Sequence, residues 1–344
     1  MHQGSAPARP LVALVAALLV LLPLATACGQ DQPREAITVY SGRGQALIGP
    51  LLNRFADETG ISVDVRYGDS ADLALQIDTE GERTAADVFI SQSPGTVGFL
   101  AAKGVLAPID AAILEKVEPA FRSSRNLWVG LSGRERVLVY NKDMVEPDDL
   151  PASVFDLTGP KYAGKVGLAP TNASFEDFVT AMREVVGDDR TREWLTAMER
   201  AGSTVYPNNN AIVAAVGRGE IPMGLVNHYY NFRALAEDPG LPSRNHSFAE
   251  GDLGRMLLVS TATVLESSQK KDLAMRLVEF LLSREAQEYF TQEDFEYPLA
   301  RGVPPRSELP PLDVAAAPKI DLESLGDELE VTLELIESSG LLRG

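Results

Sequence analysis

Residues 221–235 read IPMGLVNHYYNFRAL, and this stretch decides how the rest of the chain is interpreted. The apolar run at 221–226 predicts a buried strand, and residues 231–235 predict the start of a helix. Residues 227–230 (NHYY) therefore lie at a strand-to-helix junction, where α/β sheets place their ligands, outside the carboxyl ends of the strands.

Two phenols stand side by side at this junction. Within a strand, Tyr229 and Tyr230 would point to opposite faces, whereas in a turn or a first helical turn they can converge on one point. Adjacent tyrosines are also common as amphipathic packing residues. The pattern alone leaves both a ligand site and a packing role open.

Strand and helix patterns alternate over most of the chain. The predicted strands are 37–40, 61–67, 87–90, 137–140, 166–169 and 255–265, and the predicted helices are 47–58, 71–81, 175–186, 190–200, 211–216 and 273–282. Gly60 is placed to end the first helix. This alternation predicts an α/β fold with parallel sheets and crossover helices.

The chain is too long for one small core, which predicts two lobes. We expect residues 36–135 and 261–311 to form the first lobe, and residues 136–260 and 312–344 to form the second. Strands crossing between the lobes would act as a hinge, with a ligand cleft between the lobes. The tail repeats leucines at helical spacing from 322 to 336, which predicts an amphipathic helix clamped on the second lobe.

Residues 1–27 are interpreted as a signal peptide. Arg9 precedes an apolar run at 11–24 that is too short to span a membrane comfortably, and small residues then lead to Cys28, the only cysteine. This ending resembles a bacterial lipobox, so Cys28 is expected to carry lipid, with residues 28–35 as a tether. Cleavage without lipidation is the alternative. A lone cysteine forms no internal disulfide.

The mature chain is strongly acidic. Removing residues 1–27 takes away Arg9 and no acid, so the formal charge changes from -18 to -19. Such a chain is a poor nucleic-acid binder and is repelled by anionic lipid. We therefore expect an exported protein that contacts the membrane only through its lipidated N-terminus, at the cell surface or in the periplasm.

The chain offers no residue set for catalysis. Its histidines are His2, His228 and His246, and no nucleophile elbow, zinc-protease motif or phosphate-binding loop is present. The sequence therefore predicts a protein that is not an enzyme.

Several loops suit a ligand better. Gly42-Arg43-Gly44 lets backbone approach a ligand closely, although glycines also mark ordinary turns. Residues 170–174 (PTNAS) and 208–210 (NNN) each precede a predicted helix, and a helix N-terminus with free N–H groups suits an anion. Ordinary N-capping explains the same residues.

Taken in order, these segments resemble the periplasmic ferric-ion-binding proteins of iron ABC transporters, known as bacterial transferrins. The matching stretches are 37–43 (ITVYSGR), 67–71 (YGDSA), 86–89 (ADVF), 131–134 (LSGR), 137–141 (VLVYN), 170–175 (PTNASF), 219–222 (GEIP), 227–230 (NHYY) and 280–287 (FLLSREAQ). They extend over nearly all of residues 36–310. The resemblance implies a two-lobe periplasmic binding protein fold of type 2 and a monomeric binding protein that serves an ABC permease.

The resemblance also implies a site. Tyr229 and Tyr230 would be the paired phenolate ligands of Fe³⁺. A synergistic anion, phosphate or carbonate, would complete the coordination and be held by Asn172, Ala173, Ser174, Asn209 and Asn227, with Arg134 or Arg136 adding charge.

The chain departs from the family pattern in the first lobe. Many relatives carry a histidine or tyrosine just after the first strand and a glutamate after the third, where this chain has Gly44 or Gln45 and Gln92. Arg43 and Gln92 are the possible cleft residues on this side. A further tyrosine of some relatives corresponds to Phe175. We therefore expect iron to bind through two tyrosines with exogenous anion or water.

The chemistry agrees with such a cargo. Forming a phenolate at pH 7 costs about 4 kcal/mol, because the tyrosine pKa is about 10. A hard trivalent cation offsets this cost and a neutral solute does not. The missing first-lobe ligands leave open an organic cargo, such as a thiamine-like molecule, polyamine or phosphonate, and an envelope hydrolase or transferase is the third class considered.

Overall fold

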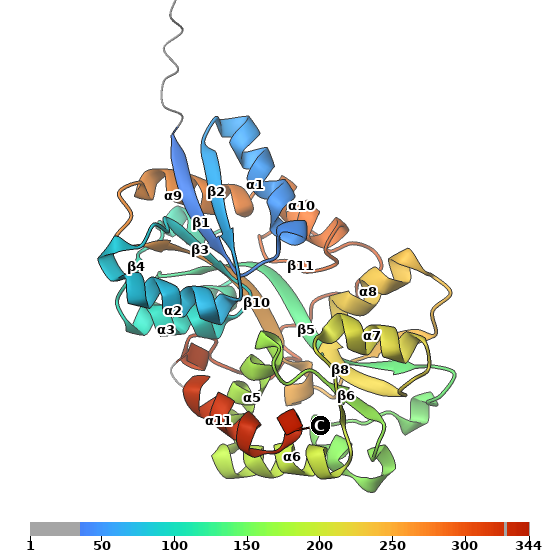
Figure 1. Cartoon of the computed structure of the whole chain (residues 1–344). Coiled ribbons are helices and arrows are strands. Elements are labelled where there is room, and N and C mark those ends of the chain that lie inside the picture. The colour runs from blue at the N-terminus through green and yellow to red at the C-terminus, as the bar shows by residue number, and fades with distance from the viewer. Residues whose placement is uncertain (1–34, 327–328, 344) are drawn as a thin grey trace, which may run out of the picture. The chain divides into compact units, whose positions relative to one another are not determined.

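The strand β5 (Val129–Asn141) connects the two halves of the molecule, because each of its ends pairs in a different part of the sheet. The computed structural model describes residues 35–326 and 329–343, and the strands run in the order β2-β1-β3-β10-β5-β8-β6-β7. Short strands β4, β9 and β11 pair with β10 or β5. Figure 1 shows β5 passing from the upper group of elements to the lower one.

The first lobe alternates strand and helix, as predicted. Its elements are β1 (Ala36–Ser41), α1 (Gln45–Thr59), β2 (Ser62–Tyr67), α2 (Ser70–Glu80), β3 (Val88–Ser91), α3 (Pro94–Ala102), β4 (Leu106–Ala107) and α4 (Ala111–Leu114). β1 pairs in parallel with both β2 and β3. Gly60 ends α1 in the left-handed conformation (φ 74°), and its N–H donates to the carbonyl of Ala56. This confirms the predicted helix stop.

The second lobe repeats this arrangement. Its elements are β6 (Val166–Leu168), α5 (Ala173–Val186), α6 (Asp188–Arg200), β7 (Thr204–Val205), α7 (Asn209–Gly217), β8 (Met223–Asn227), α8 (His228–Glu237) and β9 (Ser243–His246). β6 pairs in parallel with β7 and β8. The predicted start of α8 at Asn231 was wrong: the helix begins at His228, because Asn227 is still extended (φ -86°, ψ 145°).

The chain then returns to the first lobe through β10 (Leu257–Leu265), α9 (Lys271–Leu281), α10 (Arg284–Gln292) and β11 (Tyr297–Pro298). β10 is antiparallel to β3 and to β5, so the sheet is mixed and not wholly parallel as predicted. The predicted strand start at Arg255 was also wrong, since residues 253–255 form a 3-10 turn.

The cores show where the lobes divide. On β5, Leu131 belongs to the core of the first lobe and Leu138 to that of the second. On β10, Leu258 packs in the second core and Val259, the next residue, in the first. Successive strand residues point to opposite faces, so both strands contribute to both cores. The result is a two-lobe α/β fold with strands crossing between the lobes.

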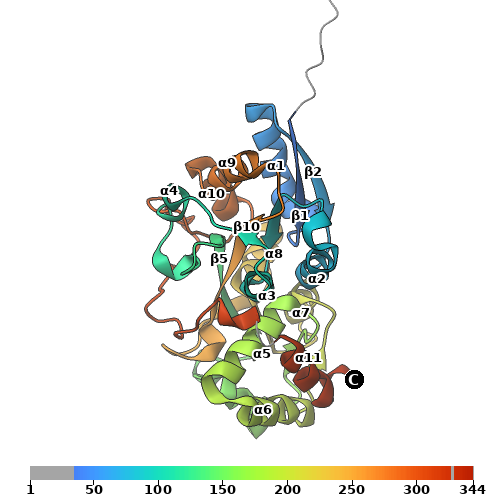
Figure 2. The same cartoon turned by 90° about the vertical axis from the view of Figure 1, so that its left-hand side faces the viewer.

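The C-terminal segment contacts both lobes. Helix α11 (Leu329–Ser338) packs on α5 and α6, and Leu335 and Ile336 lie in the second core. Figure 2 shows α11 beside α5. The preceding turn η7 (Ser324–Gly326) packs on α3 of the first lobe. The helix of the tail is thus shorter than predicted. The tail also contacts the first lobe and not only the second.

No helix within residues 35–326 and 329–343 is long and apolar enough to cross a membrane. The predicted signal peptide and Cys28 lie outside the described residues.

Candidate functional site

Tyr229 and Tyr230 lie in the first turn of α8, directly after β8. Their rings stack, with centroids 4.1 Å apart and an interplanar angle of 28°. Tyr229 is buried and Tyr230 half-buried. The helical turn therefore brings the two phenols together instead of directing them to opposite faces.

Tyr229 is surrounded by both apolar side chains and charged groups. Its ring packs with Phe295, Tyr297 and Leu309, which is the packing role that the sequence had left open. Burial raises the pKa of Tyr229 well above its usual value, and Tyr230 and Glu296 raise it further, while Arg134 lowers it. The phenol is thus held protonated in the absence of a cation.

His228 fixes the backbone just before the tyrosines. Its Nδ1 accepts a hydrogen bond from the N–H of Glu135 at 3.1 Å, and its Nε2 lies 3.0 Å from the carbonyl oxygen of Phe295. These partners require the neutral tautomer with hydrogen on Nε2. Burial lowers the pKa of His228 to about 4. No sequence pattern marks this role of His228, because both of its partners are backbone groups.

The predicted anion loop is built around the side-chain oxygen of Asn172, the N-cap residue of α5. This oxygen accepts hydrogen bonds from the N–H of Ser174 (3.2 Å), from the Ser174 hydroxyl (2.6 Å) and from Asn209 Nδ2 (3.1 Å). Ala173 is the first residue of α5. The structure therefore brings the residues of two predicted loops together at two helix N-termini, α5 and α7. Asn172 also caps α5, so ordinary capping applies here too.

Arg136 joins this loop to the end of β8, directly before the tyrosine-bearing helix α8. Its Nη1 donates to Ser174 Oγ (3.1 Å) and to Asn227 Oδ1 (3.3 Å), while its Nη2 has no hydrogen-bond partner within the described part of the protein. Burial lowers its pKa to about 10, so the group remains a cation at neutral pH. A buried cation with a free donor beside a helix N-terminus suits an anion.

Arg134, the other arginine predicted to add charge to the anion, has different neighbours in the structure. Its side chain is 2% exposed, and its Nε and Nη1 have no partner among the described residues. Its charge acts on Tyr229, Glu296 and His228. The arginine hydrogen-bonded to the loop is therefore Arg136.

Comparison with known proteins identifies the family of this chain. Residues 83–321 match the family model described as bacterial extracellular solute-binding protein. The chain belongs to that family. It is 32% identical to the Fe(3+)-binding periplasmic protein of Serratia marcescens, over 96% of this chain and 97% of the relative. It is 33% identical to a major ferric iron-binding protein of Neisseria meningitidis, over 89% of this chain and 93% of the relative.

Among solved structures, the solute-binding protein resembles iron-bound HitA from Pseudomonas aeruginosa, with a TM-score of 0.84 and 35% identity over 89% of this chain and 100% of that one. It also resembles a Trichodesmium protein in complex with iron and citrate, with a TM-score of 0.77 and 28% identity over 89% and 99%. These matches confirm the resemblance to ferric-ion-binding proteins drawn from the ordered motifs.

The first-lobe residues of this solute-binding protein are engaged with the protein itself. Arg43 is fully buried and pairs with Asp294 (3.1 Å) and Glu296 (3.0 Å), so its side chain does not line an open cleft. Gln92 is half-buried, and its Nε2 donates to the carbonyl of Gly42 at 3.2 Å. Phe175 packs against Phe178 and Trp194 in the second core.

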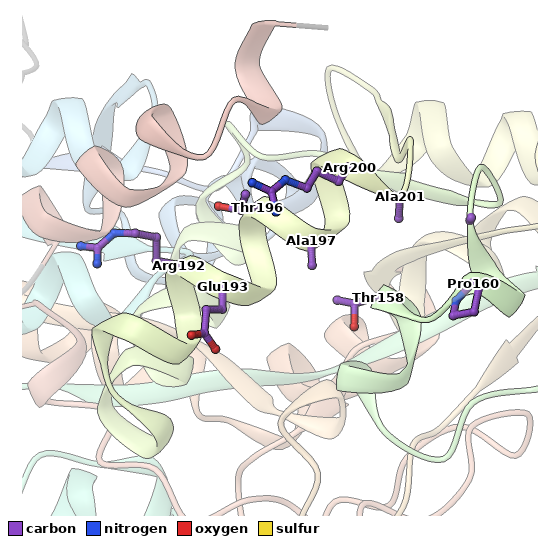
Figure 3. A pocket seen from close by; sticks show the side chains of 9 residues that line it. Thr158, Pro160, Arg192, Glu193, Thr196, Ala197, Arg200 and Ala201 are labelled. Carbon is purple, nitrogen blue, oxygen red and sulfur yellow. The ribbon is translucent and has the colours of Figure 1, made fainter.

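Residues 35–326 and 329–343 hold no group of three or more His, Cys, Asp or Glu arranged for a metal ion. A groove also lies outside the tyrosine site, between α6 and the 3-10 turns Val154–Thr158 and Pro160–Tyr162 (Figure 3). Arg192 on its α6 side points away from Thr158 and Pro160 in this view and pairs with Asp189. The groove shares no residue with the tyrosine and anion sites.

Proposed function

We propose that this solute-binding protein captures ferric iron between its lobes, with Tyr229 and Tyr230 as phenolate ligands. A synergistic anion, phosphate or carbonate, lies at the loop of Asn172, Ala173 and Ser174 and completes the coordination. The observation that carries the proposal is the stacked tyrosine pair, which presents two phenols from one helical turn beside a buried cation with a free donor.

The free-energy cost of ionising the two tyrosines favours a highly charged cation as the cargo. Because the pKa of Tyr229 is raised well above its usual value, ionising this phenol at pH 7 costs more than the ~4 kcal/mol of an exposed tyrosine. A trivalent ion stabilises two phenolates and offsets that cost, whereas a neutral or anionic cargo leaves both phenols protonated. The iron-binding names of the relatives support the same choice.

The anion site takes its charge from Arg136. Asn209 and Asn227 belong to the proposed anion site because they are hydrogen-bonded to its other members. Asn209 donates to Asn172, and Asn227 accepts from Arg136. With no carboxylate or histidine at Gly44 or Gln92, the remaining coordination positions go to the anion or to water. The iron and citrate found together in the Trichodesmium protein support an exogenous anion at such a site.

The wider role follows from the family. The closed protein docks on an ABC permease and releases iron there by anion exchange, protonation or reduction. Cys28 carries lipid and tethers the exported monomer to the membrane. The first lobe comprises residues 36–135 and 261–311, and the second residues 136–260 and 312–344, with the tail turn η7 reaching back to α3.

A titration tests the cargo. Purified apo-protein is titrated with ferric nitrilotriacetate, first in bicarbonate and then in phosphate, while the visible absorbance of tyrosinate-to-iron charge transfer is followed. Wild type should become coloured, and Tyr229→Phe and Tyr230→Phe should each lose most of this absorbance. Tyr206→Phe is the matched control, because Tyr206 is a half-buried phenol that packs beside Gly167 in the same lobe.

Two results would count against iron. If both tyrosine variants kept their colour, the iron ligands would be other residues. A colourless wild type whose melting temperature rises with a phosphonate or polyamine, and not with ferric ion, would favour the organic cargo.

A further inference from the structure

A buried carboxylate sits at the contact between the lobes. Asp177 on α5 is 3% exposed, and its Oδ1 accepts a hydrogen bond from Ser93 Oγ at 2.5 Å. Ser93 is the N-cap residue of α3 in the first lobe, and its hydroxyl also accepts from the N–H of Thr96. Asp177 Oδ2 has no partner among the described residues. The carboxylate is therefore hydrogen-bonded between α5 and α3, two helices that lie near each other in Figure 2, but only one of its oxygens has a partner among the described residues.

The same carboxylate interacts electrostatically with two arginines near the anion loop. Asp177 lies one helical turn after Ser174, which accepts a hydrogen bond from Arg136. Both Arg134 and Arg136 act on Asp177 electrostatically, and in residues 35–326 and 329–343 neither has a hydrogen-bond partner for all of its side-chain nitrogens. No ion pair within 4.0 Å joins either arginine to Asp177 in the described part of the chain. The charge of Arg136 therefore acts on the carboxylate, while its Nη1 contacts the loop that would hold the anion.

We propose that Asp177 is a specificity-determining residue that competes with the bound anion for Arg136, so that anion binding is coupled to protonation of Asp177. This inference rests on the anion site of the proposed function. When the anion binds, it neutralises the guanidinium group of Arg136, and an ionised Asp177 then loses that stabilisation. By reciprocity, the ionised carboxylate weakens anion binding and the protonated one permits it.

The electrostatic surroundings place this coupling near neutral pH. Burial raises the pKa of Asp177 to about 7, against the lowering effects of Ser93, Arg134 and Arg136. Glu176, the neighbouring residue on α5, raises the pKa of Asp177 further. From η7, backbone atoms of Leu325 come close to Gly95, which lies beside the Asp177 carboxylate. The pKa of Glu176 is itself raised to about 7, by burial and by Asp69 across the lobes, with no arginine contributing.

Sulfate tests the coupling because it remains a dianion across this pH range, so any pH dependence belongs to the protein. Sulfate affinity of the full-length apo-protein is measured by calorimetry at pH 6 and pH 8. Wild type should bind sulfate about fivefold or more tightly at pH 6. Asp177→Asn, which keeps the acceptor for Ser93, should bind with the pH 6 affinity at both values.

Two further variants separate the alternatives. Ser93→Ala removes a donor that stabilises the ionised form, so tight binding should persist to higher pH than in wild type, even if Asp177→Asn fails to fold. Glu176→Gln should keep the pH dependence. If Glu176→Gln abolishes it and Asp177→Asn does not, the coupling belongs to Glu176 and the proposal is overturned.

The remaining outcomes distinguish this inference from the proposed function. Equal sulfate affinity of wild type at pH 6 and pH 8 overturns the inference and leaves the anion site intact. If sulfate binds at neither pH, both the anion site and the inference fail, while the iron-dependent colour still decides the role of the tyrosines.

Discussion

The imidazole of His228 accepts a hydrogen bond from the backbone N–H of Glu135 at 3.1 Å, which links the first turn of α8 to the strand that crosses between the lobes. An acceptor nitrogen is available only in the neutral ring. Protonation would place a donor against the Glu135 N–H and break this link.

His228 should therefore make stability depend on pH. Its folded pKa of about 4 lies below the ordinary 6.5, so its contribution is present above pH 6.5 and is lost as the pH falls through 4. The full effect is roughly 3 kcal/mol. The carboxyls of Asp177 and Glu176 have raised pKa values, so their contribution to stability grows as the pH falls, opposite to that of His228. The measurement is thus the difference in unfolding free energy between wild type and His228→Gln, which should shrink from pH 7 to pH 4. A constant difference would contradict it.

Iron binding should release protons from both phenols. Because each ligand must ionise, affinity falls as pH falls, by as much as about 100-fold per pH unit when two protons leave. Proton release on adding ferric ion, followed with a pH-stat, should drop by one proton per iron in Tyr230→Phe. Tyr206→Phe should match wild type. Release that is unchanged in Tyr230→Phe would mean that its hydroxyl is not a ligand.

Arg136→Gln should weaken anion binding by about 10- to 100-fold, since it removes a cation and its hydrogen bonds to Ser174 and Asn227. Phosphate affinity of the apo-protein, measured by calorimetry, tests this effect. Arg200→Gln, an exposed arginine of the surface groove in Figure 3, is the control and should leave the affinity unchanged. Equal losses in the two variants would indicate only a general charge effect.

The glycine face of α3 should tolerate no side chain. A Cβ at Gly98 would lie 2.3 Å from the carbonyl oxygen of Glu323, which is backbone and cannot rotate away. Gly98→Ala should therefore lower the free energy of unfolding by about 1–3 kcal/mol. Gly44→Ala is the matched control, because its φ is -60° and no atom lies within 4 Å of the added carbon. Urea denaturation of both variants provides the comparison.

Cys28→Ser should release the protein from the membrane fraction without changing its affinity for iron. Lipid on Cys28 is the only anchor that we propose, and an acidic chain is not retained by anionic headgroups. Cell fractionation and the mass of the mature N-terminus test this prediction. Membrane retention of Cys28→Ser would show that another segment or partner holds the protein.

The sequence by itself determined the alternation of elements and the place of the tyrosine pair. Periods of 2 and 3.6 residues depend on neighbours along the chain, so they located α1, α5 and α9 to within a few residues. The NHYY stretch lies at a strand-to-helix junction, as predicted, although α8 begins three residues earlier.

Only the tertiary structure decided which side chains meet. β10 runs antiparallel to its neighbour β5. Arg43 is enclosed by Asp294 and Glu296. Arg136 reaches the anion loop, whereas Arg134 does not. Ser93 and Asp177 are 84 positions apart and become hydrogen-bonded only because α3 and α5 meet between the lobes. Such contacts depend on how whole elements pack against one another, and local periodicity carries no information about that packing.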